Sequence, residues 1–300
     1  MAHESVLLKE VIGGLSLQDG DVYLDATVGS GGHMEEVWNK TRGKVMLCGI
    51  DADEMSIAIA KEKLDLAGAK AKLSVLNFRN IDKALEIFGI KSPTKILFDL
   101  GWSSDQFNEG NRGFSFQKDE PLLMTWKTEA GEEDITAYDV INKWSEENLA
   151  LIINGYGGEK YARRIAKAIA ERRKEKPIET SRELAEIVKN AVPIFYRFGR
   201  IHPATRTFQA VRIAVNDELR ALGEGIEKGF EILEKEGRMA IISFHSLEDR
   251  IVKNFFKSLV VENKGELINK KPITPSEEEI NKNPRARSAK LRILRKSQDK

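Results

Sequence analysis

The sequence predicts an α/β fold with a doubly wound, mainly parallel sheet and an inserted, mostly helical domain. Three observations support this prediction. Short apolar segments alternate with helical segments over the first hundred residues and again after residue 216. Several of the apolar segments have no polar interruption, which is typical of strands buried on both faces. Residues from about 105 to 215 contain helical patterns but no convincing buried strand.

The elements of the first part of the chain follow this alternation in order. A strand that ends in glycines is predicted over 22–27, and a helix follows it. The complete set comprises strands over 22–27, 44–50, 71–76 and 95–100 and helices over 33–40, 55–66 and 81–88. Strands separated by helices imply parallel pairing, because a parallel connection must cross back over the sheet.

The middle of the chain is predicted to be helical. Four helices are expected there, over 145–153, 160–173, 181–191 and 204–215. The run from Thr180 to Glu183 resembles a capping box that begins the third of them. We therefore assign residues 105–215 to an inserted substrate-recognition domain, and residues 1–104 with 216–300 to the core.

The α/β pattern returns after the insertion. Helices run as far as residue 236, and a strand over 238–244 and a helix over 247–256 follow. Residues 290–294 are expected to form a last strand at the edge of the sheet. The charged, proline-containing stretch 264–285 has the composition of a linker.

Composition excludes several classes of protein. The 300 residues are 41% hydrophobic, as in an ordinary globular protein, and no apolar run reaches the roughly 20 residues of a membrane span. The first residues lack the blocks of a signal peptide, so we expect a cytoplasmic protein. A single cysteine, Cys48, and four scattered histidines leave no disulfide and predict no metal site.

Charge is distributed unevenly although the net charge is only +1. Residues 160–176 hold eight Lys/Arg against two Glu, and residues 283–300 hold seven Lys/Arg against one Asp, so each segment carries +6. Residues 129–147 hold seven acidic residues and one lysine, which makes −6. The basic segments permit an RNA partner, but such stretches are more often solvated helix faces than binding surfaces.

The first strand, its glycines and the next strand predict a site for an adenosine cofactor. Glycines at 29, 31 and 32 follow the strand, and Asp51 ends the next strand, where an acid accepts hydrogen bonds from ribose hydroxyls. The phosphate-binding lysine of a P-loop is absent, and Met34 breaks the dinucleotide pattern. Asp25 would repel a pyrophosphate but suits an ammonium group. These points favour S-adenosylmethionine over NAD.

Six segments, read in order, resemble the ribosomal RNA small subunit methyltransferase H family. They are Val-Gly-Ser-Gly-Gly-His (28–33), Asp-Leu-Gly-Trp-Ser-Ser (99–104), Arg-Gly-Phe-Ser-Phe (112–116), His-Pro-Ala-Thr-Arg-Thr-Phe-Gln-Ala-Val-Arg-Ile (202–213), Ile-Ile-Ser-Phe-His-Ser-Leu-Glu-Asp-Arg (241–250) and Asn-Pro-Arg-Ala-Arg-Ser (283–288). The resemblance runs from His3 to the basic tail, and the two longest strings are highly specific.

This resemblance implies a class I (Rossmann-like) methyltransferase core that carries an inserted recognition domain. It implies S-adenosyl-L-methionine as cofactor and N4-methylcytidine in the decoding region of small-subunit (16S) rRNA as product, with that RNA or the assembled subunit as partner. The family's cofactor contacts fall here on Gly31, Gly32, His33, Asp51, Phe78, Asp99 and Gln106. Two alternatives remain open: His33 as an exposed first-turn residue, and Phe78 as part of the core.

Asp99 and Trp102 are the candidate catalytic residues. The run Asp99-Leu-Gly-Trp102 resembles an imperfect copy of the Asp/Asn-Pro-Pro-aromatic motif of enzymes that methylate exocyclic base amines. In this interpretation Asp99, or the carbonyl of Leu100, holds the amine while Trp102 stacks on the base. Alternatively, Asp99 binds only the cofactor and Trp102 is a core residue.

Candidate substrate contacts are basic residues and one histidine. Arg206 and Gln209 are expected on one face of a helix, with Phe208 and Val211 pointing inward. An ion pair with an acidic neighbour is the alternative for Arg206 and for Arg212. The complete set of substrate candidates is Arg112, His202, Arg206, Arg212, Arg285 and Arg287.

Other reactions fit the sequence less well. Methylation at cytosine C5 needs a cysteine nucleophile, and Cys48 lies inside an apolar strand. A serine hydrolase would need a Gly-x-Ser-x-Gly elbow, which the sequence lacks. A methyltransferase for another nucleic-acid base, an RNA-binding assembly factor without catalysis and, more distantly, a nicotinamide oxidoreductase stay open.

One segment departs from the family pattern. The family reads Pro-Leu-Asp-Met-Arg-Met, whereas residues 121–126 read Pro-Leu-Leu-Met-Thr-Trp. Leu123 and Thr125 thus replace a carboxylate and a guanidinium, and an altered specificity or activity would follow if those groups handle the substrate.

Overall fold

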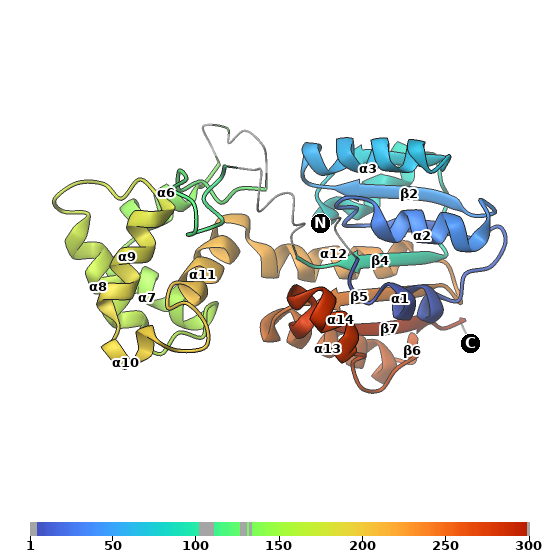
Figure 1. The fold of residues 1–300 in the computed structure, drawn as a ribbon. Coiled ribbons are helices and arrows are strands. Elements are labelled where there is room, and N and C mark those ends of the chain that lie inside the picture. The colour runs from blue at the N-terminus through green and yellow to red at the C-terminus, as the bar shows by residue number, and fades with distance from the viewer. Residues whose placement is uncertain (1–4, 102–110, 127–130, 132–133, 299–300) are drawn as a thin grey trace. The chain divides into compact units, whose positions relative to one another are not determined.

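The chain folds into two compact units, seen in a computed structural model that describes residues 5–101, 111–126, 131 and 134–298. The first unit comprises Met1–Ser104 and Leu219–Lys300, and the second comprises Asp105–Glu218. Figure 1 shows both units with their elements. No helix among the described residues meets the length and apolarity needed to cross a membrane.

A seven-stranded sheet forms the centre of the first unit (Figure 1). Its strands, in spatial order, are β3 (Ala71–Val75), β2 (Met46–Asp51), β1 (Val22–Asp25), β4 (Lys95–Asp99), β5 (Arg238–Ser243), β7 (Lys290–Lys296) and β6 (Gly265–Leu267). The first five are parallel, whereas β7 runs antiparallel to both of its neighbours. This order with one inserted antiparallel strand confirms the predicted class I methyltransferase fold.

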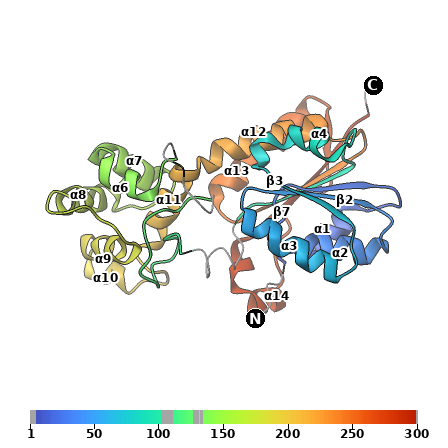
Figure 2. The same cartoon turned by 90° about the horizontal axis from the view of Figure 1, so that it is seen from above.

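Helices cover both faces of the sheet (Figure 2). Successive strand residues point to opposite faces, so Tyr23 and Leu97 join one core while Leu24, Ile96 and Phe98 join the other. The first core is closed by α1 (Leu8–Leu15), α2 (Gly32–Thr41) and α3 (Glu54–Leu66), and the second by η1 (Phe78–Lys83), α4 (Ala84–Phe88), α12 (Glu218–Ile232) and α13 (Ser246–Val261). Burial on both faces explains why these strands read as uninterrupted apolar runs.

Two predictions about the C-terminal part are wrong. The last strand was expected at the sheet edge, but β7 lies between β5 and β6. The supposed linker 264–285 contains β6 and α14 (Glu277–Lys282), and the 3₁₀ helix η2 (Pro284–Ser288) follows. β6 has only three residues, and its pairing partner β7 starts 23 positions after it ends. A local sequence pattern cannot indicate such a pairing.

The second unit is helical. Its helices are α6 (Ala137–Lys143), α7 (Glu146–Gly155), α8 (Ala162–Arg172), α9 (Ser181–Ala191), α10 (Ile194–Arg197) and α11 (Thr205–Asn216). Its described residues contain no strand beyond the isolated bridge between Pro121 and Thr180. The predicted capping box is present, because Thr180 and Glu183 each accept a hydrogen bond from the other's backbone.

Candidate cofactor and substrate site

Three aspartates end neighbouring strands at one edge of the sheet. Asp25 pairs in register with Gly49 of β2 and with Leu97 of β4. Asp51 and Asp99 each lie two residues beyond those partners, at the ends of their strands. The carboxyl ends of parallel strands are where open α/β sheets bind their ligands.

The turn between β1 and α2 needs glycine at position 31. Gly31 is the N-cap of α2 and has a φ of 79°, in the left-handed region. A Cβ at this position would lie 3.2 Å from the Cβ of Ala60 and 3.3 Å from its Cα. Backbone strain and lack of space therefore both select glycine. The turn passes close to α3 and presents its backbone at the sheet edge, and Gly32 begins α2.

Asp51 holds the turn to the second strand. Its Oδ2 accepts a hydrogen bond of 2.9 Å from the Gly29 N–H, and its Oδ1 accepts one of 2.9 Å from the Asp53 N–H. Burial raises the pKa of Asp51 to about 6, against the lowering effect of these two bonds. Each oxygen keeps a further lone pair, so the carboxylate can still accept a ligand hydroxyl.

Asp25 is buried beneath the turn, with 1% of its surface exposed. It accepts hydrogen bonds of 2.9 Å from the Tyr23 hydroxyl and 3.1 Å from the Thr27 N–H. Burial raises the pKa of Asp25 to about 6, and the charge of His33 opposes this rise. Burial, followed by the neighbouring Asp25 carboxylate, also raises the pKa of Tyr23. Sequence reasoning missed Tyr23 and Thr27, whose polar groups next to a strand-ending aspartate were the available signal.

His33 and Asp99 carry polar atoms without partners. The His33 ring is buried at 6% exposure, so the alternative that it is an exposed first-turn residue is wrong. Its Nε2 lies 3.4 Å from Asp99 Oδ2, but neither ring nitrogen has a hydrogen-bond partner among the described residues, and Asp99 Oδ1 has none either. The Asp99 backbone N–H donates to Thr27 Oγ1 at 2.6 Å. Buried polar atoms without partners are costly, so this pair fits a ligand with matching polar groups.

Of the remaining site candidates in the core, the structure describes Phe78 but not Trp102 or Gln106. Phe78 begins η1 and packs edge-to-face on Phe98, with ring centroids 5.9 Å apart. Its ring also contacts the position of Gly225, where a Cβ would lie 2.7 Å from the ring. Phe78 is only partly buried, so a face remains that can stack on a base. Trp102 and Gln106 lie outside the described residues.

Two of the arginine candidates are buried inside the helical unit. Arg112 donates to the carbonyl of Trp126 at 2.8 Å and is 3% exposed. Arg212 forms two hydrogen bonds with Glu218, at 2.8 and 2.9 Å, and its guanidinium lies 5.8 Å from the centre of the Trp126 ring. Arg212 therefore forms an ion pair within the protein, which is the alternative that the sequence left open for it.

The other candidates are more accessible. Arg206 donates to the carbonyl of Gly158 at 3.2 Å and to the Tyr196 hydroxyl at 3.5 Å. His202 stacks on Phe116 with ring centroids 4.4 Å apart, and partial burial together with the charge of Lys189 lowers its pKa. Phe208 and Val211 are buried as predicted. Arg285 and Arg287 are exposed on η2, in the first unit.

Backbone hydrogen bonds hold the segment 121–126, which departs from the family pattern, in place. The Met124 N–H donates to the Arg112 carbonyl at 2.7 Å, and the Met124 carbonyl accepts from Asn216 at 2.7 Å. The Leu123 carbonyl accepts from the N–H of Ala137, at the start of α6. Thr125 is 5% exposed, whereas Leu123 is partly exposed. The substitutions therefore lie in an ordered part of the helical unit.

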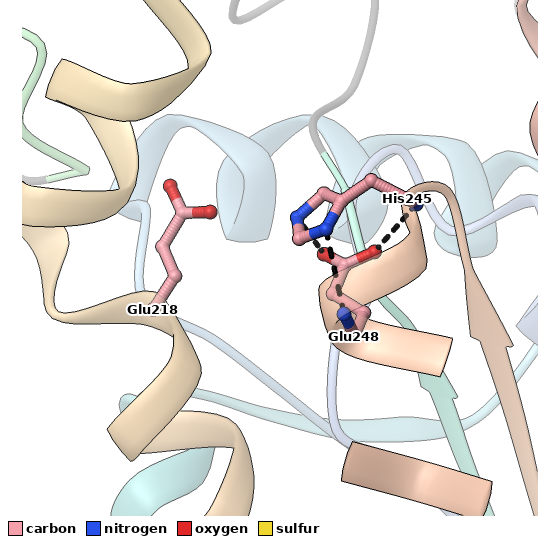
Figure 3. A group of neighbouring side chains, drawn as sticks. All are labelled: Glu218, His245 and Glu248. Atoms are coloured by element: carbon pink, nitrogen blue, oxygen red, sulfur yellow. Dashed lines mark hydrogen bonds and ion pairs between the residues drawn. The ribbon is translucent and has the colours of Figure 1, made fainter. Parts of the chain in front are cut away.

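His245 is the N-cap residue of α13, a structural role that accounts for its place in the run Ser243–Ser246 (Figure 3). Its Nδ1 accepts from the Glu248 N–H at 3.4 Å, and Glu248 Oε2 accepts from the N–H groups of Phe244 and His245. A histidine thus takes the N-cap place in a reciprocal capping box. Cys48 is fully buried, and burial raises its pKa to about 11, so it is no nucleophile.

A family model and the relatives most similar in sequence indicate one family. The model of the MraW methylase family matches residues 1–297. A protein of Sulfurihydrogenibium sp. named Ribosomal RNA small subunit methyltransferase H is 48% identical over 98% of this chain and 99% of its own length. The proteins of the same name from Persephonella marina and Clostridioides difficile are 47% and 44% identical; each alignment covers 98% of this chain, with 99% and 98% of the respective relative. A solved Streptococcus mutans putative methyltransferase in complex with SAH matches with a TM-score of 0.46 and 14% identity, covering 98% of this chain and 99% of that chain.

Proposed function

Because this chain belongs to the MraW methylase family, we propose that it transfers a methyl group from S-adenosylmethionine to the N4 amine of a cytidine in small-subunit ribosomal RNA. The relatives carry the name of a small-subunit ribosomal RNA methyltransferase. The proposal places the reaction in the cytoplasm, with the RNA or the assembled subunit as substrate, and the target in the decoding region.

The single observation that carries the chemistry is the pair of His33 and Asp99. Both side chains have buried polar atoms with no hydrogen-bond partner among the described residues. They lie next to the turn that requires Gly31. The neighbouring carboxylates of Asp25 and Asp51 suit the ammonium and the ribose hydroxyls of S-adenosylmethionine. The cofactor supplies a methyl group on a positively charged sulfur. The chain's own residues must therefore mainly align the acceptor.

We assign Asp99 the task of orienting the acceptor amine. The lone pair of the cytosine amine is delocalised into the ring, so the nitrogen is a poor nucleophile. Asp99 Oδ1 is free to accept one N–H of that amine, which helps to direct the lone pair out of the ring plane. The nitrogen would form a bond to the methyl carbon as the carbon–sulfur bond breaks and leaves its electron pair on the sulfur of the departing thioether. The methylated nitrogen then releases one proton, which bulk water takes up. Trp102 would stack on the base.

The inserted domain, which we bound at residues 105–215, is proposed to recognise the RNA. Arg206 and His202 are its accessible candidates, and Arg285 and Arg287 offer phosphate contacts from the core. Arg112 and Arg212 support this surface from inside through Trp126 and Glu218. The cofactor contacts are assigned to Gly31, Gly32, His33, Asp51, Phe78 and Gln106.

The test is transfer of labelled methyl from S-adenosylmethionine to unmethylated small subunits and, separately, to their naked RNA. Nuclease digestion and nucleoside chromatography then identify the product. Label in N4-methylcytidine is expected, with a loss of about 100-fold or more in Asp99→Ala and unchanged folding. Asp19→Ala, at an exposed site, is the control.

Two other outcomes would contradict the proposal. Label in another nucleoside would indicate a methyltransferase for a different base. Cofactor binding without any transfer would indicate an assembly factor that keeps the fold but not the chemistry, and Leu123→Asp with Thr125→Arg would then test whether the family residues restore transfer.

A further inference from the structure

Residues 194–201 expose an unusual number of large apolar side chains. The segment consists of α10 and the turn that follows it, between α9 and α11 (Figure 1). Phe195 is 71% exposed and Phe198 is 83% exposed. Ile194 and Ile201 are exposed at 69% and 47%. Four such side chains within eight residues form a patch of the kind that marks a binding surface.

Contacts of Tyr196 with the rest of the helical unit hold this segment in place. The Tyr196 hydroxyl donates to Glu159 Oε2 at 2.7 Å, and Glu159 is fully buried. The Tyr161 ring packs edge-to-face on Tyr196 at 4.9 Å, and the Lys160 ammonium lies 5.1 Å from the Tyr196 ring centre. These contacts hold the middle of the segment in place, so the phenylalanines on either side of Tyr196 are presented on a fixed backbone.

The charged residues within the stretch 189–206, which contains the patch, have one sign. Residues 189–206 contain Lys189, Arg197, Arg200 and Arg206 and no Asp or Glu, which makes a formal charge of +4. Arg200 is exposed. Arg197 donates to the carbonyls of Val192 and Asn190 and so closes the end of α9. Alternating phenylalanine and arginine residues in an anion-attracting surface are typical of proteins that bind single-stranded nucleic acid.

We propose that residues 194–201 bind single-stranded RNA, with Phe195 and Phe198 stacking on unpaired bases and Arg200 contacting phosphate. This inference rests on the proposed function and extends it, since it names a surface for nucleotides other than the reacting cytidine. Unpaired bases are required, because bases in a duplex are stacked on one another and offer no free face. A second copy of the chain is a poorer occupant, since a symmetric contact would place +4 against +4.

The experiment measures binding of a labelled single-stranded oligoribonucleotide of about 12 nucleotides and of its duplex to the full chain. The variant is Phe195→Ala with Phe198→Ala. The matched control is Leu151→Ala, on α7 of the same unit, where Leu151 is 69% exposed. We expect single-strand affinity to fall about 30-fold or more in the double variant, with duplex affinity and the control unchanged. Arg200→Ala should make the slope of log affinity against log salt concentration shallower by about one.

Three results would overturn the inference. The first is unchanged single-strand affinity in the double variant, and the second is an equal loss for single strand and duplex. The third is self-association of the wild-type chain in sedimentation that the double variant abolishes, which would make the patch an interface between copies.

The same variants separate this inference from the proposed function. If the wild type makes N4-methylcytidine but the double variant binds single strands normally, the surface fails and the function stands. If no product forms but single-strand binding still depends on Phe195 and Phe198, the function fails and the surface stands.

Discussion

At the residue level, the site contains two carboxylates, Asp25 and Asp51, whose pKa burial raises. Asp25 and Asp51 both have a pKa raised to about 6 because burial disfavours their charge. The raised pKa means that the folded state binds these protons more tightly than the unfolded state. Their contribution to stability is therefore present below about pH 4 and is lost as pH rises through about 6. Between these values the protein without ligand should become less stable.

Cofactor binding should show the opposite trend with pH. The ammonium of S-adenosylmethionine favours an ionised Asp25, and its ribose hydroxyls favour an ionised Asp51 as hydrogen-bond acceptor. Affinity should therefore rise from pH 5 to pH 7 and level off above, with release of protons near pH 6. Calorimetry in two buffers of different ionisation enthalpy measures both quantities. Asp51→Asn should weaken the trend, and Asp19→Asn, at an exposed position, should keep it. An affinity that is flat from pH 5 to pH 7 would contradict this account.

Arg212 and Arg206 differ in burial, so their substitutions should have different effects. Arg212→Ala removes the two hydrogen bonds from the buried Arg212 to the partly buried Glu218 and should cost about 3 kcal/mol of unfolding free energy. Arg206→Ala, on the accessible side of the same helix, should change stability by less than about 1 kcal/mol but weaken RNA binding. Urea unfolding and RNA titration measure the two effects. Equal stability losses would show that Arg206 is also structural.

At the scale of elements, the turn from β1 to α2 joins the sheet to the site. The hydrogen bond from Gly29 to Asp51 ties this turn to β2, and the Gly31 N–H donates to the Val28 carbonyl at 2.9 Å. The turn is tight because Gly31 lies against Ala60 of α3. A shift of a few tenths of an ångström here would move the backbone that faces the ligand.

Gly31→Ala should therefore affect stability and binding together. The left-handed φ costs a non-glycine residue about 1–2 kcal/mol, and the contact with Ala60 adds to it. The melting temperature should fall, and the increase on adding S-adenosylmethionine should shrink. Gly13→Ala is the control, since no atom lies within 4 Å of its Cβ and the position is inside a helix. A full cofactor response in Gly31→Ala would mean that the turn adapts.

At the scale of the whole molecule, charge is separated along the chain although the net charge is near zero. The net charge of +1 gives no sign of a polyanionic partner, but residues 189–206 carry +4 without an acidic residue. The proposed cofactor site, by contrast, would hold a small molecule by hydrogen bonds at the strand ends. The two ligands should therefore respond differently to salt.

Affinity for RNA should fall steeply between 50 and 200 mM salt, while affinity for S-adenosylmethionine should change little. Each phosphate contact adds about −0.7 to the slope of log affinity against log salt for a single strand, so the four cations of 189–206 supply up to about −3. Parallel titrations at several salt concentrations measure both slopes. A flat RNA slope would mean that these cations do not meet phosphate.

Local sequence patterns were enough to predict several strands and helices, and also the residues needed at a turn and at a strand end. Apolar runs marked β2 and β4, the run from Thr180 to Glu183 marked the start of α9, and strand–glycine–acid spacing marked Gly31 and Asp51. These features are local, because side-chain alternation, capping and positive φ act over a few residues.

Where distant segments meet became visible in the folded chain alone. There β7 lies inside the sheet and Arg212 is buried against Glu218. The His33 and Asp99 side chains face each other, with polar atoms that have no hydrogen-bond partner among the described residues. Each of these outcomes depends on pairing or desolvation between residues far apart in sequence, and the free energy of such contacts is set by packing that no local pattern encodes.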